Sequence, residues 1–360
     1  LSGVRIMAYT TIDDPSAYFQ NLIWSGNATD DRALTFDGNS DLQPDFTWFK
    51  CRSNSTNHQL IDSVRGVTKQ LNSNLAAAET TDSTLFKSFN SDGITIGTGG
   101  VVNDSGRTYC AWNWKGGTTA SGTTGGSGTG KSYSYSANTT SGFSVVTYTG
   151  NATAGHLIPH GMGKVPRLIH VKSRGDDNGW TSGTIVSASA WNDHGYLYLA
   201  NAFGTDANQF GATPDSTNFR LGTGTGTNGN NGTRVALCFA DVQGFQKIGK
   251  YVGNGNADGT FVYTGFRPAY VIQKSLTTAY GWQIYDNKRG GFNSQNDEIV
   301  ANADSAETDG SGNGFPDFLS NGFKLRNTDI NKNASGVPYL YLAVAESPFV
   351  TSTGVPTTAR

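Results

Sequence analysis

The chain has 360 residues, of which only 15% are charged, and its 26 basic and 28 acidic side chains leave a formal net charge of −2. Proteins that bind nucleic acid or a membrane surface normally carry a basic excess or a basic stripe, so this balance excludes a charge-driven partner of either kind. The 47 glycines make this residue about twice as common as usual, without a collagen period, which favours many short strands joined by tight turns.

The start of the chain lacks the apolar stretch of a secretory signal peptide, and no apolar run approaches the roughly 18 residues of a membrane span. We therefore expect folding in the cytoplasm and no membrane insertion. Met7, one of only two methionines, predicts that residues 1–6 are an upstream extension of the reading frame. Cys51, Cys110 and Cys238 are odd in number and far apart, which predicts small buried side chains and neither disulfides nor a zinc site.

One block of sequence recurs three times along the chain. Each copy opens with an aromatic residue shortly before a Gly-Asn pair, continues with a proline that leads an apolar run ending in lysine, and closes with an aromatic, apolar run. The proline-led runs are residues 44–50, 166–172 and 268–274. At about 100 residues, each copy is too long for a propeller blade or a solenoid turn and has the size of a sandwich.

Within each copy, short segments rich in Val, Ile, Tyr, Phe and Thr alternate with Gly, Asn and Asp clusters at intervals of roughly 8 to 12 residues. This spacing predicts an all-β protein with three tandem antiparallel β-sandwich modules. Helical periodicity is almost absent, and the strongest candidate for a helical turn lies around residues 75–79.

The tract from Gly116 to Ser141 is rich in Gly, Ser and Thr, which predicts a flexible or extended linker. Only residues 242–244 join the second and third copies, so we expect these two modules to be tightly docked and the first to be more independent. The predicted organisation is an N-terminal segment (1–17), module one (18–115), a linker (116–142), module two (143–243), module three (244–349) and a C-terminal tail (350–360).

Several segments carry a family resemblance. The segment His160-Gly161-Met162-Gly163, which leads to Pro166, resembles a His-Gly-Leu-Gly segment that recurs in phage tail-fibre proteins. Residues 111–115 and 261–268 are similar to a family of repeated-module structural proteins of marine tailed bacteriophages. The resemblance implies a virion component built from jelly-roll or concanavalin-like sandwiches, and it supplies no catalytic residue.

Some matches to known motifs lack the required context. Residues 125–132 satisfy the phosphate-loop pattern, but no buried strand precedes them, and residues 133–135 after them predict a strand where a helix is required. Residues 224–229 match a dinucleotide fingerprint, but no helical pattern follows them. A calcium loop starting at Asn254 would need Glu where Gly265 stands. Pro159 lies between His156 and His160 and breaks the helix that would bring them together. We therefore expect no cofactor and no metal, although calcium sites of other types stay open.

The aligned copies place His58, Trp180 and Trp282 at one position. In the first and third copies an aspartate follows four residues later and an arginine three residues after that: Asp62 and Arg65, Asp286 and Arg289. One hypothesis is a glycan-binding site in which an aromatic ring stacks on a pyranose while Asp and Arg bind its hydroxyl groups. The alternative is a core aromatic residue beneath a loop that carries a surface Asp–Arg pair.

These observations favour a non-enzymatic structural protein on the virion surface, assembled in the bacterial cytoplasm, which serves as a tail-fibre or host-attachment component. We expect it to form a homo-oligomer, to contact other virion proteins and to bind a host surface glycan. The alternatives are a capsid-decorating or head-fibre protein without receptor binding, and a secreted lectin or glycan-degrading enzyme.

Overall fold

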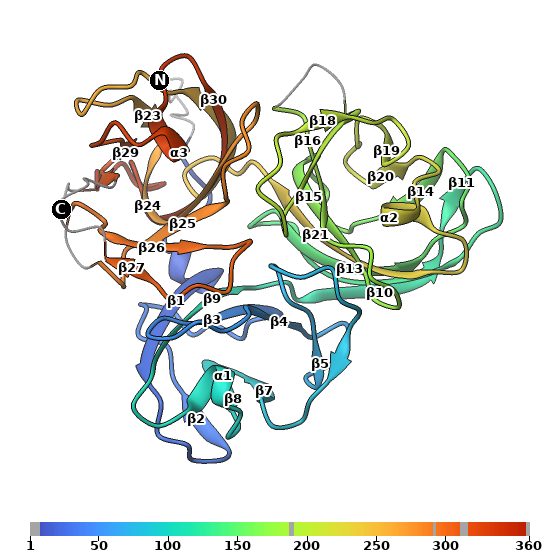
Figure 1. Cartoon of the computed structure of the whole chain (residues 1–360), viewed down its shortest axis with the longest axis horizontal. Coiled ribbons are helices and arrows are strands. Elements are labelled where there is room, and N and C mark those ends of the chain that lie inside the picture. The colour runs from blue at the N-terminus through green and yellow to red at the C-terminus, as the bar shows by residue number, and fades with distance from the viewer. Residues whose placement is uncertain (1–7, 187–190, 291–292, 310–315, 358–360) are drawn as a thin grey trace, which may run out of the picture.

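The computed structural model describes residues 8–186, 191–290, 293–309 and 316–357, so the predicted extension at residues 1–6 lies outside it. Almost all regular structure is β, in antiparallel sheets, which confirms the all-β prediction. By chain order the sheets form module 1 (19–114), module 2 (118–240) and module 3 (246–348). Figure 1 shows these modules as three lobes around a common centre.

Module 1 has a larger sheet of order β1-β9-β3-β4, a smaller sheet of order β2-β8-β7, and a β5-β6 ribbon. A turn of 3-10 helix, η1 (Pro15–Ala17), precedes it and is capped by the Asp14 side chain. The elements of the module are β1 (Phe19–Ser25), β2 (Arg32–Leu34), β3 (Phe46–Cys51), β4 (Gln59–Asp62), β5 (Lys69–Gln70), β6 (Thr80–Thr81), β7 (Phe86–Asn90), β8 (Gly93–Ile96), α1 (Gly100–Asn103) and β9 (Thr108–Trp114).

Module 2 has a larger sheet of order β10-β12-β13-β21-β15-β16-β17-β18 and a smaller one of order β11-β14-β20-β19. Its elements are β10 (Thr118–Thr123), β11 (Gly125–Gly126), β12 (Ser132–Asn138), β13 (Phe143–Thr149), β14 (His156–Pro159), β15 (Pro166–Ser173), β16 (Thr181–Thr184), β17 (Asp193–Tyr196), β18 (Gly204–Thr205), β19 (Phe210–Ala212), β20 (Asn218–Leu221), α2 (Thr225–Asn228) and β21 (Thr233–Ala240).

Module 3 has a larger sheet of order β22-β30-β24-β25-β26-β27 and a smaller one of order β23-β29-β28. Its elements are β22 (Gln246–Val252), β23 (Phe261–Tyr263), β24 (Phe266–Ser275), β25 (Gln283–Asp286), β26 (Asp297–Val300), β27 (Thr308–Asp309), β28 (Asp317–Leu319), β29 (Gly322–Lys324), α3 (Ile330–Asn333) and β30 (Pro338–Pro348).

The sequence repeat corresponds to a structural repeat. In every module the opening strand pairs with the closing strand, which pairs with the proline-led strand, which pairs with the strand after it: β1-β9-β3-β4, β13-β21-β15-β16 and β22-β30-β24-β25. A one-turn helix precedes each closing strand. The three copies therefore share one topology, and their differences are additions at the edges of the sheets.

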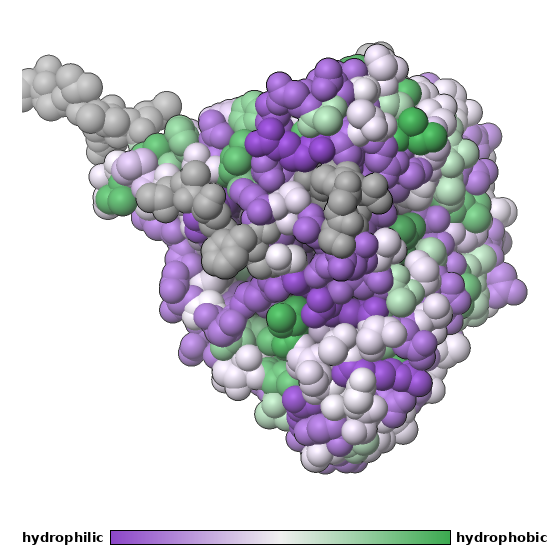
Figure 2. All heavy atoms as spheres, turned by 60° about the vertical axis from the view of Figure 1, so that its left-hand side comes forward, coloured by the Kyte–Doolittle hydropathy of each residue, from purple (hydrophilic) through white to green (hydrophobic). Residues whose placement is uncertain are grey.

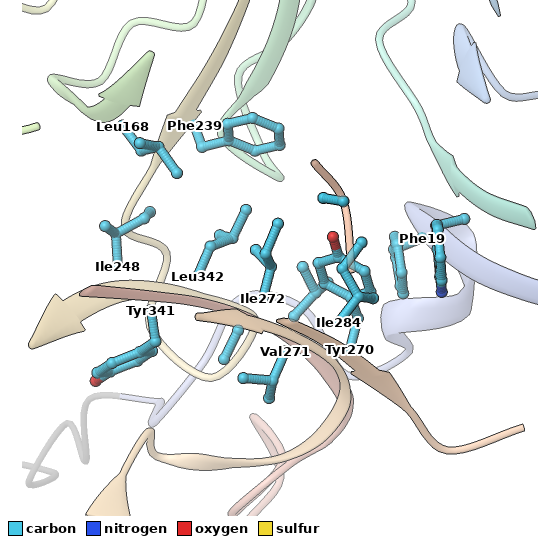
Figure 3. Packing of buried hydrophobic residues seen from close by; sticks show 14 of the residues in the cluster. Phe19, Leu168, Phe239, Ile248, Tyr270, Val271, Ile272, Ile284, Tyr341 and Leu342 are labelled. Carbon is cyan, nitrogen blue, oxygen red and sulfur yellow. The ribbon is translucent and has the colours of Figure 1, made fainter. Parts of the chain in front are cut away.

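A single hydrophobic cluster contains residues of all three modules. Trp114 of module 1 lies 6.1 Å from Phe143 of module 2 and 5.5 Å from Tyr270 of module 3, between ring centroids. Figure 3 shows Phe19, Leu168 and Phe239 converging on side chains of module 3. Each module thus buries part of its large sheet against the other two.

The predicted linker is part of module 2. Residues 118–123 form β10 and residues 132–138 form β12, which join the larger sheet in register with β13. The linker prediction is wrong because Tyr133 and Tyr135 alternate with serines, so their rings lie on one face, stacked 6.0 Å apart. Within this tract rich in Gly, Ser and Thr, the alternation at residues 133–135 alone predicted a strand, and the structure confirms it as part of β12.

Other expectations also need correction or are confirmed. Residues 75–79 are not helical, because the segment crosses to module 2 and pairs its backbone there; apart from η1, the helices in the described ranges are the single turns α1, α2 and α3. Module 1 is not set apart, since it shares the central cluster with both neighbours. All three cysteines are buried and free, as predicted. No helix in the described ranges is long and apolar enough to cross a membrane.

We predict that thermal unfolding is a single cooperative transition, because separating any module would expose the shared aromatic cluster. Calorimetry should give equal calorimetric and van't Hoff enthalpies for the whole chain. A separate early transition, or release of a folded module 1 after proteolysis at residues 116–130, would contradict a shared core.

Candidate functional site

The aligned aromatic position is a docking contact between modules. The Trp180 Nε1 donates to the Asn72 carbonyl at 2.8 Å, the Trp282 Nε1 donates to the Tyr196 carbonyl at 2.9 Å, and the His58 Nε2 lies 3.1 Å from the Val300 carbonyl. Each contact joins one module to another: module 2 to 1, module 3 to 2, and module 1 to 3. The contacts therefore close a ring.

A lysine eight residues before each aromatic position repeats this pattern. These lysines, Lys50, Lys172 and Lys274, are buried, and the Nζ atom of each donates to backbone carbonyls of its own module. Each Nζ also donates to one carbonyl of the neighbouring module. The pairs are Lys50 with Asp304 at 3.2 Å, Lys172 with Ala76 at 2.9 Å and Lys274 with Ala200 at 3.1 Å. Burial lowers the pKa of Lys274 to about 7 and that of Lys172 to about 8. Carbonyl oxygens replace the lost water around each ammonium group.

The receiving segments are equivalent. In each segment, one carbonyl accepts from the aromatic position, and the carbonyl four residues later accepts from the lysine. Three residues after that, a backbone N–H donates to a carbonyl of the module that supplies the lysine. These bonds are Glu79 to the Arg174 carbonyl at 2.9 Å, Phe203 to the Leu276 carbonyl at 2.9 Å and Glu307 to the Arg52 carbonyl at 2.8 Å. The same backbone geometry thus recurs at all three interfaces. We call residues 72–79, 196–203 and 300–307 the receiving segments.

The predicted Asp–Arg pairs support two of these segments. In module 3, Arg289 donates from Nε to Asp286 and from Nη1 to Glu307 Oε2, the latter at 2.7 Å. In module 1, Arg65 joins Asp62 to Glu79 in the same way, with its Nη1 3.0 Å from Glu79 Oε2. Burial opposes ionisation of Asp286, but the Arg289 guanidinium prevails and lowers the pKa of that carboxyl. Glu79 and Glu307 then bind Arg174 and Arg52 of the neighbouring modules.

Among the residues that the structure describes, the third interface has no such ionic chain. Leu276 stands where Arg52 and Arg174 stand in the other modules, and Phe203 stands where Glu79 and Glu307 stand. Thr184, which aligns with the two aspartates, donates its hydroxyl to the Arg167 carbonyl at 2.7 Å. Apolar contact replaces charge pairing between modules 2 and 3.

All seven candidate residues are buried. His58, Trp180, Trp282, Asp62 and Asp286 are at most 2% exposed, and Arg65 and Arg289 are below 10%. A sugar-stacking platform needs an open ring face, so the predicted glycan-binding site does not exist at the surface. The alternative, a core aromatic residue, agrees with the structure, except that the Asp–Arg pair is also buried.

The His58 ring is held as a neutral imidazole. Trp48 Nε1 donates to His58 Nδ1 at 2.8 Å, which leaves the proton on Nε2 for the Val300 carbonyl. Burial, together with the Lys50 cation nearby, lowers the pKa of His58 to about 3, and burial alone lowers that of His170 to about 3. Neither ring can gain a proton without loss of this packing.

The open surface offers a different candidate, a groove on module 3. Phe261 and Tyr263 lie on the same side of β23, 43% and 47% exposed, while Val262 between them is buried. Lys247 Nζ lies 5.3 Å from the Tyr263 ring centroid, and Tyr341 lines the same groove. We call this the aromatic groove; its volume is about 610 Å³.

The aromatic pair of the groove is not repeated in module 2, although Arg167 of module 2 also lines the groove. Cross-strand partners show that Phe261 and Tyr263 correspond to Leu157 and Pro159 of module 2. A Cβ on Gly249 would lie 2.7 Å from the Tyr341 hydroxyl oxygen, so glycine is needed to let that ring lie across the groove. The alternating aromatic pair was present in the sequence, but sequence alone did not show which side of the strand is open.

The described residues contain no group of three or more His, Cys, Asp or Glu side chains placed to hold a metal ion. His156 is buried and contacts Thr124 Oγ1 at 2.6 Å and Asn228 Oδ1 at 2.9 Å, so it is a structural residue. The phosphate-loop match spans β11 and the start of β12, and no helix follows it. Figure 2 shows a mainly hydrophilic surface with small separate hydrophobic areas.

We predict that Trp282→Ala lowers the free energy of unfolding by about 3–5 kcal/mol, because it leaves a cavity at the interface of modules 2 and 3 and removes the bond to the Tyr196 carbonyl. Urea titration measures the effect. Val252→Ala, at an exposed site of the same module, is the control and should change stability by about 0.5 kcal/mol or less. Equal stability of the two variants would contradict the docking role of Trp282.

We predict that the protein loses stability as the pH falls below about 6.5. The folded-state pKa values of His58 and His170 are lowered to about 3, so protons bind the unfolded chain first, and the stability present above 6.5 is lost progressively towards pH 3. Melting temperatures at pH 7 and pH 5 measure this loss. His58→Asn should reduce proton uptake on unfolding at pH 5 by about one; unchanged uptake would show that His58 is protonated in the fold.

The family model described as "Domain of unknown function (DUF7483)" matches residues 14–348. No curated protein and no solved structure gives a significant match. The matched region starts at the residue that caps η1 and ends with the last residue of β30, so it includes all three modules. The chain belongs to the DUF7483 domain family.

Proposed function

We propose that this protein is a non-enzymatic structural protein on the surface of a tailed-phage virion, where it binds host-cell polysaccharide through the aromatic groove of module 3. We further propose that each module is a β-sandwich of the jelly-roll or concanavalin-like type, since each combines a larger and a smaller antiparallel sheet. The resemblance of the sequence to repeated-module phage proteins supports the virion assignment. The single observation that carries the binding function is the pair of exposed rings on β23.

Two rings at alternate positions of a strand form a flat apolar surface at little entropic cost, because each ring has few rotatable bonds. Sugar rings in a polysaccharide present apolar C–H faces at a similar repeat. Polar groups along the groove, including Thr260 and the Lys250 side chain, are placed to bind hydroxyl groups. An open, elongated groove suits a section of polymer better than a single small molecule.

The charges of the groove favour an acidic polysaccharide. Arg167, Lys247 and Lys250 outnumber Asp241, which pairs with Arg167 at 3.1 Å. Two lysines thus remain to attract carboxylate, sulfate or phosphate groups on the polymer. Multiple copies of the chain on one virion would raise the overall avidity, so weak binding by each groove is sufficient.

Capsid decoration without receptor binding is the second candidate. The closed ring of three equivalent interfaces favours it, because such a rigid body needs no ligand to stabilise a particle. The two functions differ in location and in glycan binding. Antibody labelling of virions tests the location: label at the fibre tips supports attachment, label over the head supports decoration, and an absence of label on virions contradicts both.

We predict that the double variant Phe261→Ala/Tyr263→Ala binds acidic polysaccharide at least about ten-fold more weakly, since each stacked ring contributes on the order of 1 kcal/mol or more. Its melting temperature should stay close to that of the wild type because both rings are exposed. Glycan arrays and surface plasmon resonance provide the measurements.

Ile330→Ala is the matched control, an exposed apolar residue of module 3 outside the groove, and it should bind normally. Affinity for the polysaccharide should also fall with rising salt concentration. Unchanged binding by the double variant, or failure of the wild type to bind any polysaccharide of susceptible cells, overturns the groove as the receptor site.

A further inference from the structure

The ring of modules has one seam without a peptide connection. Residues 115–117 connect module 1 to module 2, and residues 241–245 connect module 2 to module 3. Between modules 3 and 1 the end of β30 meets the start of β1 without such a link. The N-terminal segment bridges this seam instead: Thr10 Oγ1 donates to the Gln243 carbonyl at 2.8 Å, and the Tyr9 hydroxyl donates to the Gly265 carbonyl at 2.8 Å.

A pocket of about 330 Å³ lies at this seam, and we call it the seam pocket. It is near the lower end of the range for small-molecule sites. The lining comes from both sides of the seam: η1, β1 and residues 37–39 belong to the N-terminal side, and β24, residues 287–288 and the end of β30 belong to module 3. It is separate from the aromatic groove, with which it shares no lining residue.

A buried amide in the seam pocket is half satisfied. Asn21 is 4% exposed, and its Nδ2 donates to the Ala269 carbonyl at 2.9 Å and to Asn287 Oδ1 at 2.8 Å. These two bonds fix the orientation of the amide. The Asn21 Oδ1 atom is buried and has no hydrogen-bond partner among the described residues. An unmatched buried acceptor costs free energy, which a ligand that donates a hydrogen bond would recover.

The remaining polar groups match a neutral polyhydroxylated ligand. Three carboxylates, of Asp14, Asp37 and Glu346, face two cations, Arg267 and Lys288, so neither a strongly anionic nor a strongly cationic ligand is favoured. Both ion pairs are formed: Lys288 of module 3 binds Asp37 across the seam, and Arg267 Nη2 lies 3.1 Å from Glu346 Oε1 within module 3. Adjacent hydroxyl groups can donate to such carboxylates and accept from such cations at the same time.

We propose that the seam pocket binds a neutral, polyhydroxylated ligand of the size of one sugar residue, and that this ligand joins module 3 to module 1 where the chain does not. Asn21 and Asp37 accept its hydroxyl protons, and Lys288 donates to its oxygens. The proposal does not depend on binding in the aromatic groove. A free monosaccharide and the terminal sugar of a longer glycan share this chemistry.

The test is titration of the purified chain with glucose, galactose, mannose and glycerol, followed by NMR chemical shifts and by melting temperature. We expect shifts at Asn21 and Asn287 and a higher melting temperature, because a ligand that binds only the folded ring stabilises it. An oligosaccharide with the same terminal sugar separates the two sources: equal affinity indicates recognition of the terminal residue, and loss of affinity indicates a closed site for free sugar.

The variant Asp37→Asn/Lys288→Met should weaken binding by about ten-fold, since it removes charged partners of the hydroxyl groups. Asp258→Asn/Lys324→Met is the matched control: that pair is similarly exposed, with 77% and 25% of the side chains accessible against 69% and 29% for Asp37 and Lys288, and lies outside the pocket. The groove variant Phe261→Ala/Tyr263→Ala should also retain binding. The proposal fails if none of the four probes shifts Asn21, or if the control variant weakens binding equally.

Discussion

The architecture depends on three buried lysine ammonium groups, each of which completes its set of carbonyl acceptors only when the neighbouring module is in place. An ammonium group removed from water is costly unless oxygen atoms surround it. Because Lys50, Lys172 and Lys274 each take one of these oxygens from a receiving segment, an isolated module would leave its lysine partly unsatisfied. The ring is thus the smallest unit in which these three lysines have all the acceptors that the structure gives them.

The aromatic position and the ionic chains add to this constraint unequally. All three interfaces have the lysine contact, the donor eight residues later and the returning backbone N–H. Among the described residues, only two interfaces also have a chain of Asp, Arg, Glu and Arg, in which the Asp and the first Arg are buried and the Glu and the second Arg are half-buried. Replacing a buried ion pair with apolar side chains is often neutral or stabilising, so Leu276 and Phe203 can serve the third interface without loss. All three interfaces share the same backbone geometry of docking, and they differ in the side chains that lie next to these backbone contacts.

The two binding sites that we propose lie where the three copies differ. Equivalent positions are occupied by residues that hold the ring together, and a change there would disturb an interface. The aromatic groove uses side chains of β23 that module 2 does not repeat, and the seam pocket lies at the one junction that has no peptide link. Binding surfaces on a rigid scaffold can change without cost to its core.

The local properties of this protein can be predicted from its amino-acid sequence. Strand-forming segments, turn-rich intervals, the triple repeat and the buried cysteines follow from residue type and short-range pattern, which depend on near neighbours in the chain. Which residues of different modules come into contact depends on how the modules pack together, and only the three-dimensional structure shows this. An aromatic residue after a strand can stack on a ligand or fill an interface, and only the position of the Tyr196 carbonyl of another module shows that Trp282 does the latter. The tract after Gly116 has the composition of a linker, but an open sheet edge at β13 gave its alternating tyrosines a partner. Pairing across a hundred residues and exposure of one strand side are non-local properties, and no local pattern contains them.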